Sequence, residues 1–305
     1  MLDIKIQNEF DNLKAVIVGI ADNFGGIPKI NDCYDPKSKQ HVQQGNYPTN
    51  IACVKEINNL IDIFKKYNVN VYQPKNINGV NQIFTRDIVF VIDEKLIIPN
   101  IIDDRKHEIT AIDNILKLID NSNKIIMPKD ARVEGGDVIL SNKYIFVGFS
   151  ESEDFNKYKV ARTNRQGLNF IKKTFPDKEV LGFELVKSDE NPRINALHLD
   201  CCFQPIGNNM AILCKEGFKN EEDVSFLINY FGEKNIIFIN SEEMYNMNSN
   251  VFSISNNIIV SEKKFSRLNV LLKKYGFIVE EISFSEIGKM SGLLRCSTMP
   301  LLRHL

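Results

Sequence analysis

Short apolar runs separated by two or three turn-forming residues recur along the chain. Asn, Gly and Asp tolerate the positive φ angles of tight hairpin turns, so four of these pairs predict β-hairpins. The expected strand pairs are 88–92 with 95–99, 133–140 with 144–148, 197–205 with 210–214, and 251–255 with 258–260. The pattern therefore predicts antiparallel strand pairs, not isolated strands.

Segments with apolar residues at helical spacing lie between the hairpins. They predict helices over 51–67, 104–118, 163–175, 221–231 and 263–275. A short apolar strand is expected after each helix, over 69–72, 124–127, 179–183, 235–239 and 277–281. Helix–strand units that recur at roughly 50–60 residues indicate repeated modules that close on themselves around a central cavity.

One domain over 1–305 is expected, because no linker rich in Ser or Pro and no change in charge divides the chain. Residues 21–50 break the pattern, since they are rich in Asn, Asp, Gly, Pro and Gln without a clear period. A loop of this length in a compact domain is usually a lid or binding loop, or else disordered. The sequence leaves both alternatives open.

Composition narrows the class of protein only a little. A hydrophobic content of 43% and a charged content of 25% are typical of a soluble globular protein. The net charge of −1 gives no general attraction to nucleic acid or to an anionic membrane. Without a long apolar run or a signal-like start, we expect a cytoplasmic protein whose six cysteines are mostly buried free thiols.

His198 and Asp200 alternate with Leu199 in an expected strand, so both should lie on one face of it. A histidine beside a carboxylate suits acid–base catalysis and substrate binding, whereas a lone buried histidine is more often a core residue. Cys202 shares the expected face and raises a His/Asp/Cys metal site as an alternative. Zinc sites normally use four protein ligands, or three and a water, so we favour a site without metal.

Two acidic segments precede other expected strands. In Glu134-Gly135-Gly136-Asp137, the glycines permit close approach of the backbone to a ligand, although a surface turn has the same composition. The apolar residues that follow favour a place inside a sheet. Asp87 either forms an ion pair with Arg86 at a strand end or receives a substrate cation.

Cys296 lies near the C-terminus, between Arg295 and the hydroxyl of Ser297. An adjacent positive charge can lower the pKa of a thiol, although neighbours on a strand face opposite ways. A single cysteine is more often an inert thiol. A thiol, an imidazole and several carboxylates are nevertheless the groups needed to attack the carbon of a guanidinium, and their convergence would indicate a cysteine-dependent enzyme.

With these segments in this order, the chain resembles the guanidino-group modifying enzyme superfamily. Its members include arginine deiminases, dimethylarginine dimethylaminohydrolases, agmatine deiminases and amidinotransferases. Residues 8–19 are similar to the first strand of an amidinotransferase, and 81–87 resemble the deiminase segment that holds the guanidinium. Arg105 with Glu108, and Arg162, resemble segments that supply arginines near the substrate. The likeness covers nearly the whole chain.

The resemblance implies an α/β fold, a five-bladed propeller of ββαβ modules with pseudo-fivefold symmetry, and no cofactor. It implies that Cys296 is the nucleophile and His198 the acid and base. The implied partners of the substrate are Glu134, Asp87, Asp200, Asn81, Arg105 and Arg162. If the two arginines grip a carboxylate, an arginine-like substrate is favoured over agmatine. The alternative is that they pair with nearby acids such as Glu108.

We expect hydrolysis of arginine or a substituted arginine through an amidino-thioether on Cys296, with release of citrulline and ammonia or an amine. Amidino transfer from arginine to an acceptor amine is the alternative. Glu134 favours a hydrolase, because amidinotransferases usually have Asp there, whereas residues 8–19 favour a transferase. The expected partner is a small guanidino compound, with no nucleic acid or membrane, and the oligomeric state, a homodimer included, stays open.

Overall fold

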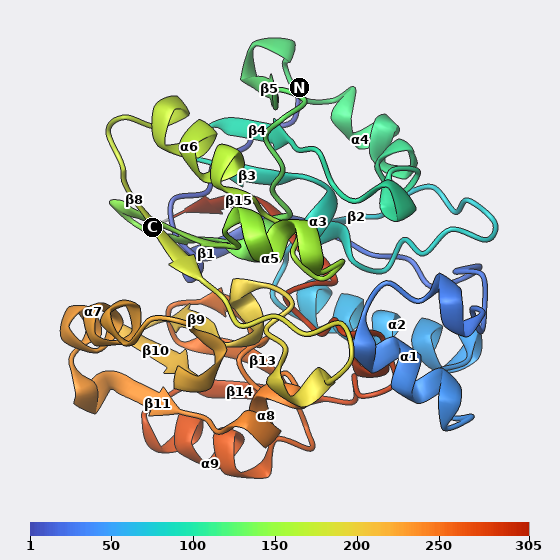
Figure 1. Cartoon of the computed structure of the whole chain (residues 1–305). Coiled ribbons are helices and arrows are strands. Elements are labelled where there is room, and N and C mark those ends of the chain that lie inside the picture. Colours follow the sequence, from blue (N-terminus) through green and yellow to red (C-terminus); the bar gives the residue numbers. More distant parts are fainter. Residues whose placement is uncertain (305) are drawn as a thin grey trace.

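The computed structural model describes residues 1–304, which form a mixed α/β structure (Figure 1). Their strands form five three-stranded sheets, and in each sheet the middle strand is antiparallel to one neighbour and parallel to the other. With the middle strand of each sheet second, the five sheets consist of β15 (Thr298–His304), β1 (Asn12–Val18) and β2 (Asn70–Tyr72); β3 (Phe90–Ile92), β4 (Lys95–Ile98) and β5 (Lys124–Ile126); β6 (Val138–Ser141), β7 (Tyr144–Phe149) and β8 (Glu179–Glu184); β9 (Phe203–Ile206), β10 (Met210–Leu213) and β11 (Ile236–Phe238); and β12 (Phe252–Ser255), β13 (Ile258–Glu262) and β14 (Ile278–Ile282).

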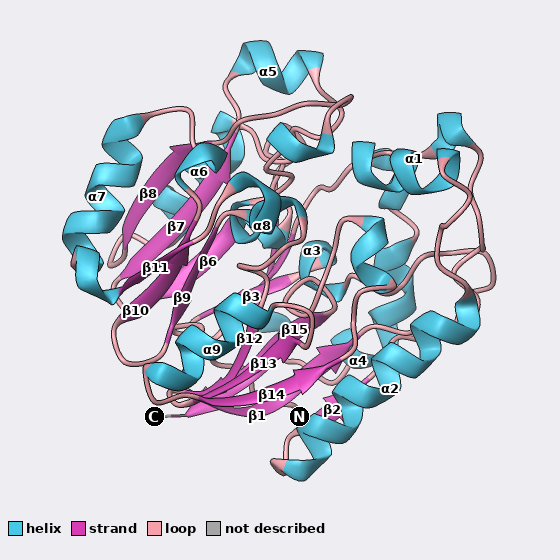
Figure 2. Ribbon diagram, turned by 90° about the horizontal axis from the view of Figure 1, so that it is seen from below, coloured by secondary structure: helices cyan, strands magenta, loops and turns pink. Residues whose placement is uncertain are grey.

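Four of the five predicted helices connect a middle strand to its parallel neighbour. They are α2 (Asn50–Lys66), α6 (Arg165–Thr174), α7 (Glu221–Phe231) and α9 (Ser266–Lys274). In Figure 2, α2 and α7 flank the strands on opposite sides of the molecule. The remaining α-helices are the shorter α1 (Pro36–Gln43), α3 (Thr85–Ile88), α4 (Asp113–Leu116), α5 (Ser152–Lys157) and α8 (Ser241–Tyr245).

The prediction of one continuous helix over 104–118 is wrong. Two 3₁₀ helices (Asp103–Arg105 and Glu108–Ile112) precede the short helix α4 in this segment. Arg105 and Glu108 are both buried and bond to each other through two N–H donors. The backbone turns to place this charged pair inside, and the regular helical pattern is interrupted there.

The four predicted hairpins are confirmed, and the turns of three of them have the expected positive φ angles. Asp93, Asn142, Asn208 and Asn209 have φ angles of 48°, 55°, 60° and 56°. The first strand of each hairpin begins later than predicted, and in three of them the predicted start forms a turn. These turns include α3 and the 3₁₀ helices Gly135–Asp137 and Leu199–Cys201.

The two ends of the chain pair with each other. β1 runs antiparallel to β15, with Asn12 opposite His304 and Val18 opposite Thr298, so the first sheet is completed by the last strand. Residues 21–50 contain α1, in which Pro36, Lys37 and Ser38 are buried. Among the helices of residues 1–304, none combines the length and apolarity that a membrane span requires.

Candidate active site

The turns that precede the first strands of the sheets carry most of the predicted functional residues. Asp87 lies in α3 before β3, Glu134 directly precedes the 3₁₀ helix before β6, and His198 directly precedes the one before β9. Cys296 lies in a turn before β15. Residues that are far apart in the sequence thus occupy similar places in successive modules, and the fold brings them together.

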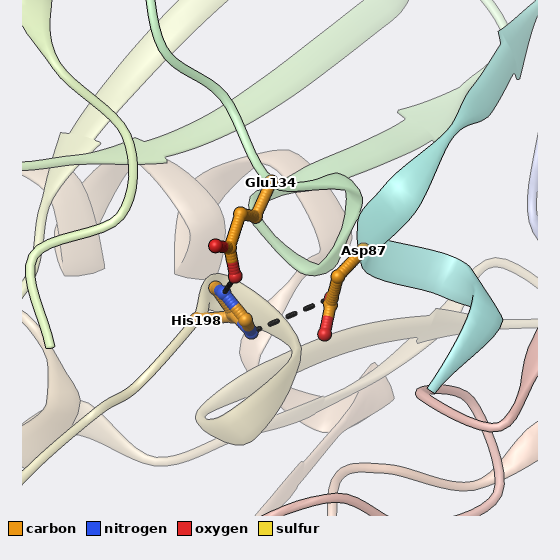
Figure 3. A group of neighbouring side chains, drawn as sticks. All are labelled: Asp87, Glu134 and His198. Atoms are coloured by element: carbon orange, nitrogen blue, oxygen red, sulfur yellow. Dashed lines mark hydrogen bonds and ion pairs between the residues drawn. The ribbon is translucent and has the colours of Figure 1, made fainter. Parts of the chain in front are cut away.

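His198 lies between two carboxylates (Figure 3). Its Nε2 is 3.0 Å from Oε2 of Glu134, and its Nδ1 is 3.7 Å from Oδ1 of Asp87. All three side chains are buried. Burial alone would lower the pKa of His198, but the charges of Asp87 and Asp137 and the hydrogen bond to Glu134 raise it. The imidazole of His198 therefore keeps its proton, which it can donate, to a higher pH than a free histidine does.

Gly136 allows this close approach. A Cβ atom at this position would lie 2.6 Å from Nδ1 of His198 and 2.9 Å from Oδ1 of Asp87. The backbone N–H of Gly136 also donates to Oδ1 of Asp87 at 3.1 Å. The close approach in this structure is to two side chains of the protein, and the predicted place of this segment inside a sheet is wrong, because it forms a 3₁₀ turn.

The predicted alternation of His198 and Asp200 along a strand is also wrong. Leu199–Cys201 form a 3₁₀ helix, in which Asp200 turns towards Arg295 and Cys296. The thiol of Cys202 contacts the carbonyl of Leu199 instead of completing a His/Asp/Cys set.

Asp87, Glu134 and His198 do offer ligand atoms within 4.8 Å of one another. Arg105 donates to both carboxylates and Arg162 to Glu134, so a metal ion would compete with the positive charges of two arginines. This charge balance does not favour a metal at the site.

Cys296 is 2% exposed, and its Sγ lies 3.7 Å from Oδ2 of Asp200. Burial raises the pKa of this thiol well above its usual range, and the charges of Asp200 and Asp87 raise it further. Without a nearby cation, the side chain is therefore a neutral thiol. All six cysteines of the chain are free, and all except Cys33 are buried.

Asn250 is a neighbour of Cys296 that sequence reasoning missed. Its Nδ2 donates to Sγ of Cys296 at 3.2 Å, and its Oδ1 accepts from the N–H groups of Arg295 and Cys296 at 2.9 and 3.2 Å. Its position shortly before β12 is equivalent to that of the other site residues. This position is the signal that could have identified Asn250 from the sequence.

The thiol and the imidazole belong to one buried region. The backbone N–H of Arg86 donates to the carbonyl of Cys296 at 3.1 Å, and the next residue, Asp87, faces His198. From the other side, Asp200 follows two residues after His198 and contacts the sulfur. The structure thus brings the predicted nucleophile, acid and carboxylates together.

Arg105 and Arg162 point into the same region. The Nε and Nη2 of Arg105 bond to Glu108 at 2.9 and 2.8 Å, while its Nη1 lies 2.7 Å from Asp87 and 3.3 Å from Glu134. Arg162 donates to Glu134 at 3.1 Å. Both arginines are therefore paired with acids in this structure. Burial would raise the pKa of Glu134, but Arg162, His198 and Arg105 lower it well below its usual range.

The alternative of an Arg86–Asp87 ion pair is wrong. Arg86 lies 3.9 Å from Glu9, whereas Asp87 pairs with Arg105. Arg295 bonds to Glu9 at 2.9 Å and to Asp200 at 2.9 Å. A second buried charge network therefore supports the turn that carries Cys296.

A cavity of about 310 Å³ lies outside the buried cluster, and we call it the outer chamber. Its walls include Tyr34, Asp35, Asn81, Asp104, His107 and Glu108. Glu108 connects it to Arg105, and the carbonyl of Tyr34 accepts from Nη2 of Arg162 at 2.7 Å. Asn81 thus lines the outer chamber and does not contact the carboxylate cluster. A larger cavity of about 550 Å³, beside Lys37 and Lys264, is lined by none of the predicted site residues.

Comparison with known proteins identifies the family. A family model described as N,N dimethylarginine dimethylhydrolase, eukaryotic, matches residues 31–303. The chain belongs to this family. The predicted resemblance to the guanidino-group modifying superfamily is thereby confirmed.

The chain is also similar to curated proteins from bacteria. The uncharacterized protein YkgA of Bacillus subtilis (strain 168) is 26% identical over 300 residues, which cover 97% of the chain and 94% of YkgA. The arginine deiminase of Streptococcus pneumoniae (strain Hungary19A-6) is 27% identical over 206 residues. These cover 58% of the chain and 48% of the deiminase, so that match spans about half of the relative.

Solved structures share the fold of this dimethylarginine dimethylhydrolase family member. SxtG, an amidinotransferase from Microseira wollei, matches with a TM-score of 0.76 and 20% identity over 99% of this chain and 98% of SxtG. The inosamine-phosphate amidinotransferase StrB1 of Streptomyces griseus matches with a TM-score of 0.78 and 15% identity over 100% and 98% of the two chains. The N-terminal domain of ArgZ, an arginine dihydrolase from cyanobacteria, gives 0.77 and 18% over 96% and 98%. The chain is thus an enzyme of the guanidino-modifying type, hydrolase or amidinotransferase.

Proposed function

We propose that this protein is a cysteine-dependent hydrolase of arginine or a substituted arginine. The observation that carries the proposal is the buried convergence of the Cys296 thiol, the His198 imidazolium and the carboxylates Asp87, Glu134 and Asp200. The proposal treats residues 1–305 as one catalytic domain. In it, the five modules form a five-bladed α/β propeller with these turns at its centre.

The first half-reaction follows from the charges. Carboxylates that accept from the N–H groups of a guanidinium orient its carbon and retain the cation. The substrate cation and the His198 imidazolium stabilise the thiolate of Cys296, which burial otherwise disfavours, and the proton of the thiol passes to water. The sulfur bonds to the guanidinium carbon, His198 gives its proton to the leaving nitrogen, and the C–N bond breaks. An amidino-thioether on Cys296 and a free amine or ammonia remain.

The second half-reaction decides the class of enzyme. In hydrolysis, His198 takes a proton from water, whose oxygen bonds to the carbon as the C–S bond breaks and the thiolate leaves. In amidino transfer, an acceptor amine replaces the water. The same residues serve both outcomes, and we favour hydrolysis because Glu134 is typical of the hydrolases that the chain resembles.

Arg105 and Arg162 are proposed to meet the carboxylate of an arginine-like substrate, and Asn81 to line its path. The pairing of both arginines with acids in this structure means that binding has to rearrange them. The family description names N,N dimethylarginine, so methylated arginines belong in the substrate panel.

The test is an assay of products by mass spectrometry. The protein is incubated with arginine, methylated arginines and agmatine, with and without glycine as an acceptor amine. Citrulline with ammonia marks a deiminase, citrulline with a methylamine marks a dimethylarginine hydrolase, and ornithine with a new guanidino compound marks a transferase. Ornithine with ammonia marks an arginine dihydrolase, the type of enzyme that ArgZ is described as. A lack of turnover with every guanidino compound would remove the proposal.

A further inference from the structure

Arg105 occupies a place among carboxylates that would suit a substrate guanidinium. Its Nη1 lies 2.7 Å from Asp87 and 3.3 Å from Glu134, and its other two nitrogens bond to Glu108. A planar guanidinium with carboxylates at both ends is the bonding pattern expected for a bound guanidino compound. The protein's own side chain therefore fills hydrogen-bonding positions that the substrate needs.

The protein's own cations offset much of the negative charge around Arg105. Burial raises the pKa of Glu108 to about 7, so above this pH it adds a negative charge to those of Asp87 and Glu134. Arg105 and Arg162 supply two positive charges, and His198 supplies a third while it is protonated. A substrate guanidinium placed beside them would meet like charge at short range in a buried site, where repulsion is strong. One of the protein's cations has to move before the substrate binds well.

Arg105 is better placed to move than Arg162. Its partner Glu108 lines the outer chamber, so Arg105 can keep its two-point bond to Glu108 while its Nη1 leaves Asp87 and Glu134. Nη2 of Arg105 also donates to one backbone carbonyl, that of Phe84, at 3.2 Å, whereas Arg162 is held by two. Its Nε donates to the carbonyl of Lys159 at 2.9 Å, and its Nη2 donates to that of Tyr34 at 2.7 Å.

We propose that Arg105 is an internal competitor of the substrate and thereby sets specificity. A guanidino compound that carries a carboxylate draws Arg105 towards the chamber and frees Asp87 and Glu134 for its own guanidinium. A guanidino compound without a carboxylate has to displace Arg105 unaided. This inference rests on the proposed function for the identity of the ligand, but it concerns binding and not turnover.

Calorimetric binding of two matched ligands at pH 8 tests the competition. The ligands are 4-guanidinobutyrate and butylguanidine, of which only the first has a carboxylate. Both are titrated into Cys296→Ser, which cannot form the adduct, and into the same protein with Arg105→Met. Removal of the competitor should tighten butylguanidine about tenfold or more and leave 4-guanidinobutyrate unchanged or weaker. Unchanged or weaker binding of butylguanidine, or none to either protein, would overturn the proposal.

Two further variants separate competition from general effects. Arg162→Met removes a similar charge beside Glu134 and should tighten butylguanidine less, and an equal or larger gain would overturn the special role of Arg105. Arg105→Lys keeps a positive charge beside Glu108, and it replaces the Met variant in the titration if that variant does not fold. Lysine lacks the fork that spans Glu108 and Asp87, so butylguanidine should again bind more tightly. If these affinities are as expected but the wild-type protein yields no product in the mass-spectrometric assay, the proposed reaction is wrong and the competition by Arg105 stands.

Discussion

Arg295 and Arg105 are both buried among carboxylates, yet their surroundings differ. Arg295 is 0% exposed and bonds to Glu9, to Asp200 and to the carbonyl of Val138. Within residues 1–304, none of these partners lines the outer chamber. Arg105 forms a comparable set of bonds, but its partner Glu108 does line the chamber.

On the proposed competition, access to a cavity, and not pairing alone, separates a structural arginine from an exchangeable one. Burial would raise the pKa of Glu9, but the charges of Arg295 and Arg86 lower it to about 2. Arg295 thus keeps a buried acid ionised and holds Asp200 beside Cys296. Arg105 is itself buried, but its partner Glu108 lines the chamber towards which Arg105 would turn when a ligand takes its other partners.

Arg295→Met is expected to have the largest effect on stability. It leaves Glu9 and Asp200 buried without their cation, which should lower the free energy of unfolding by about 3–5 kcal/mol. Urea denaturation measures the loss. Arg105→Met should cost clearly less, because Glu108 reaches the chamber and its water. Equal losses in the two variants would break the comparison.

The pH dependence of thiol alkylation sharpens the contrast between the buried sulfur and an exposed one. The raised pKa of Cys296 means that the reactive thiolate fraction should keep growing, about tenfold per pH unit, between pH 7 and 9. Iodoacetamide labelling with peptide mapping measures the rate at this residue, and Cys296→Ser corrects for reaction at the more exposed Cys33. A plateau below pH 8 would contradict the assigned environment.

Asn250→Ala removes the hydrogen bond that the turn before β12 donates to the sulfur of Cys296. Loss of a hydrogen bond to a charged group costs about 1.5–3 kcal/mol, so alkylation of Cys296 should slow about 10- to 100-fold. Asn248→Ala is a matched control, since Asn248 is also buried and its Oδ1 has no partner within residues 1–304. The expectation fails if both variants react alike.

His198→Gln is expected to give the smallest effect, seen in the pH dependence of stability. The pKa of His198 is raised in the folded protein, so its stabilising contribution is fully present below its unfolded value of about 6.5. That contribution is lost as pH rises through the folded pKa. The stability difference between wild type and variant should therefore shrink from pH 6 to pH 9, as followed by denaturation, and a growing difference would be contrary to this assignment.

Helices with an uninterrupted apolar period were predictable from the sequence. The prediction over 221–231 coincides with α7, and that over 51–67 differs from α2 by one residue at each end. Strand starts at 133 and 197 were wrong, because a buried 3₁₀ turn has the same apolar composition as a strand. The pairing of β1 with β15 depends on residues at opposite ends of the chain, which local patterns do not relate.

The chemical groups of the site were predictable, but their contacts were not. Residues such as His198 and Cys296 stand out by type and context. Asn250 does not, because an amide before a strand is common, and only the folded turn aims it at the sulfur. The inward orientation of Arg105 follows from the packing of three separate turns. The arrangement of these side chains depends on contacts between modules more than on the apolar periodicity within each module.

The central claim is that Cys296 forms a covalent bond with the carbon of a guanidino substrate. Wild-type protein mixed with arginine or a methylated arginine is quenched in acid within milliseconds to seconds, and its intact mass and peptides are measured. The account predicts an added amidino-type group on Cys296 that appears and decays with turnover and is lacking in Cys296→Ser. Turnover that persists in Cys296→Ser, or an adduct on another residue, would contradict it.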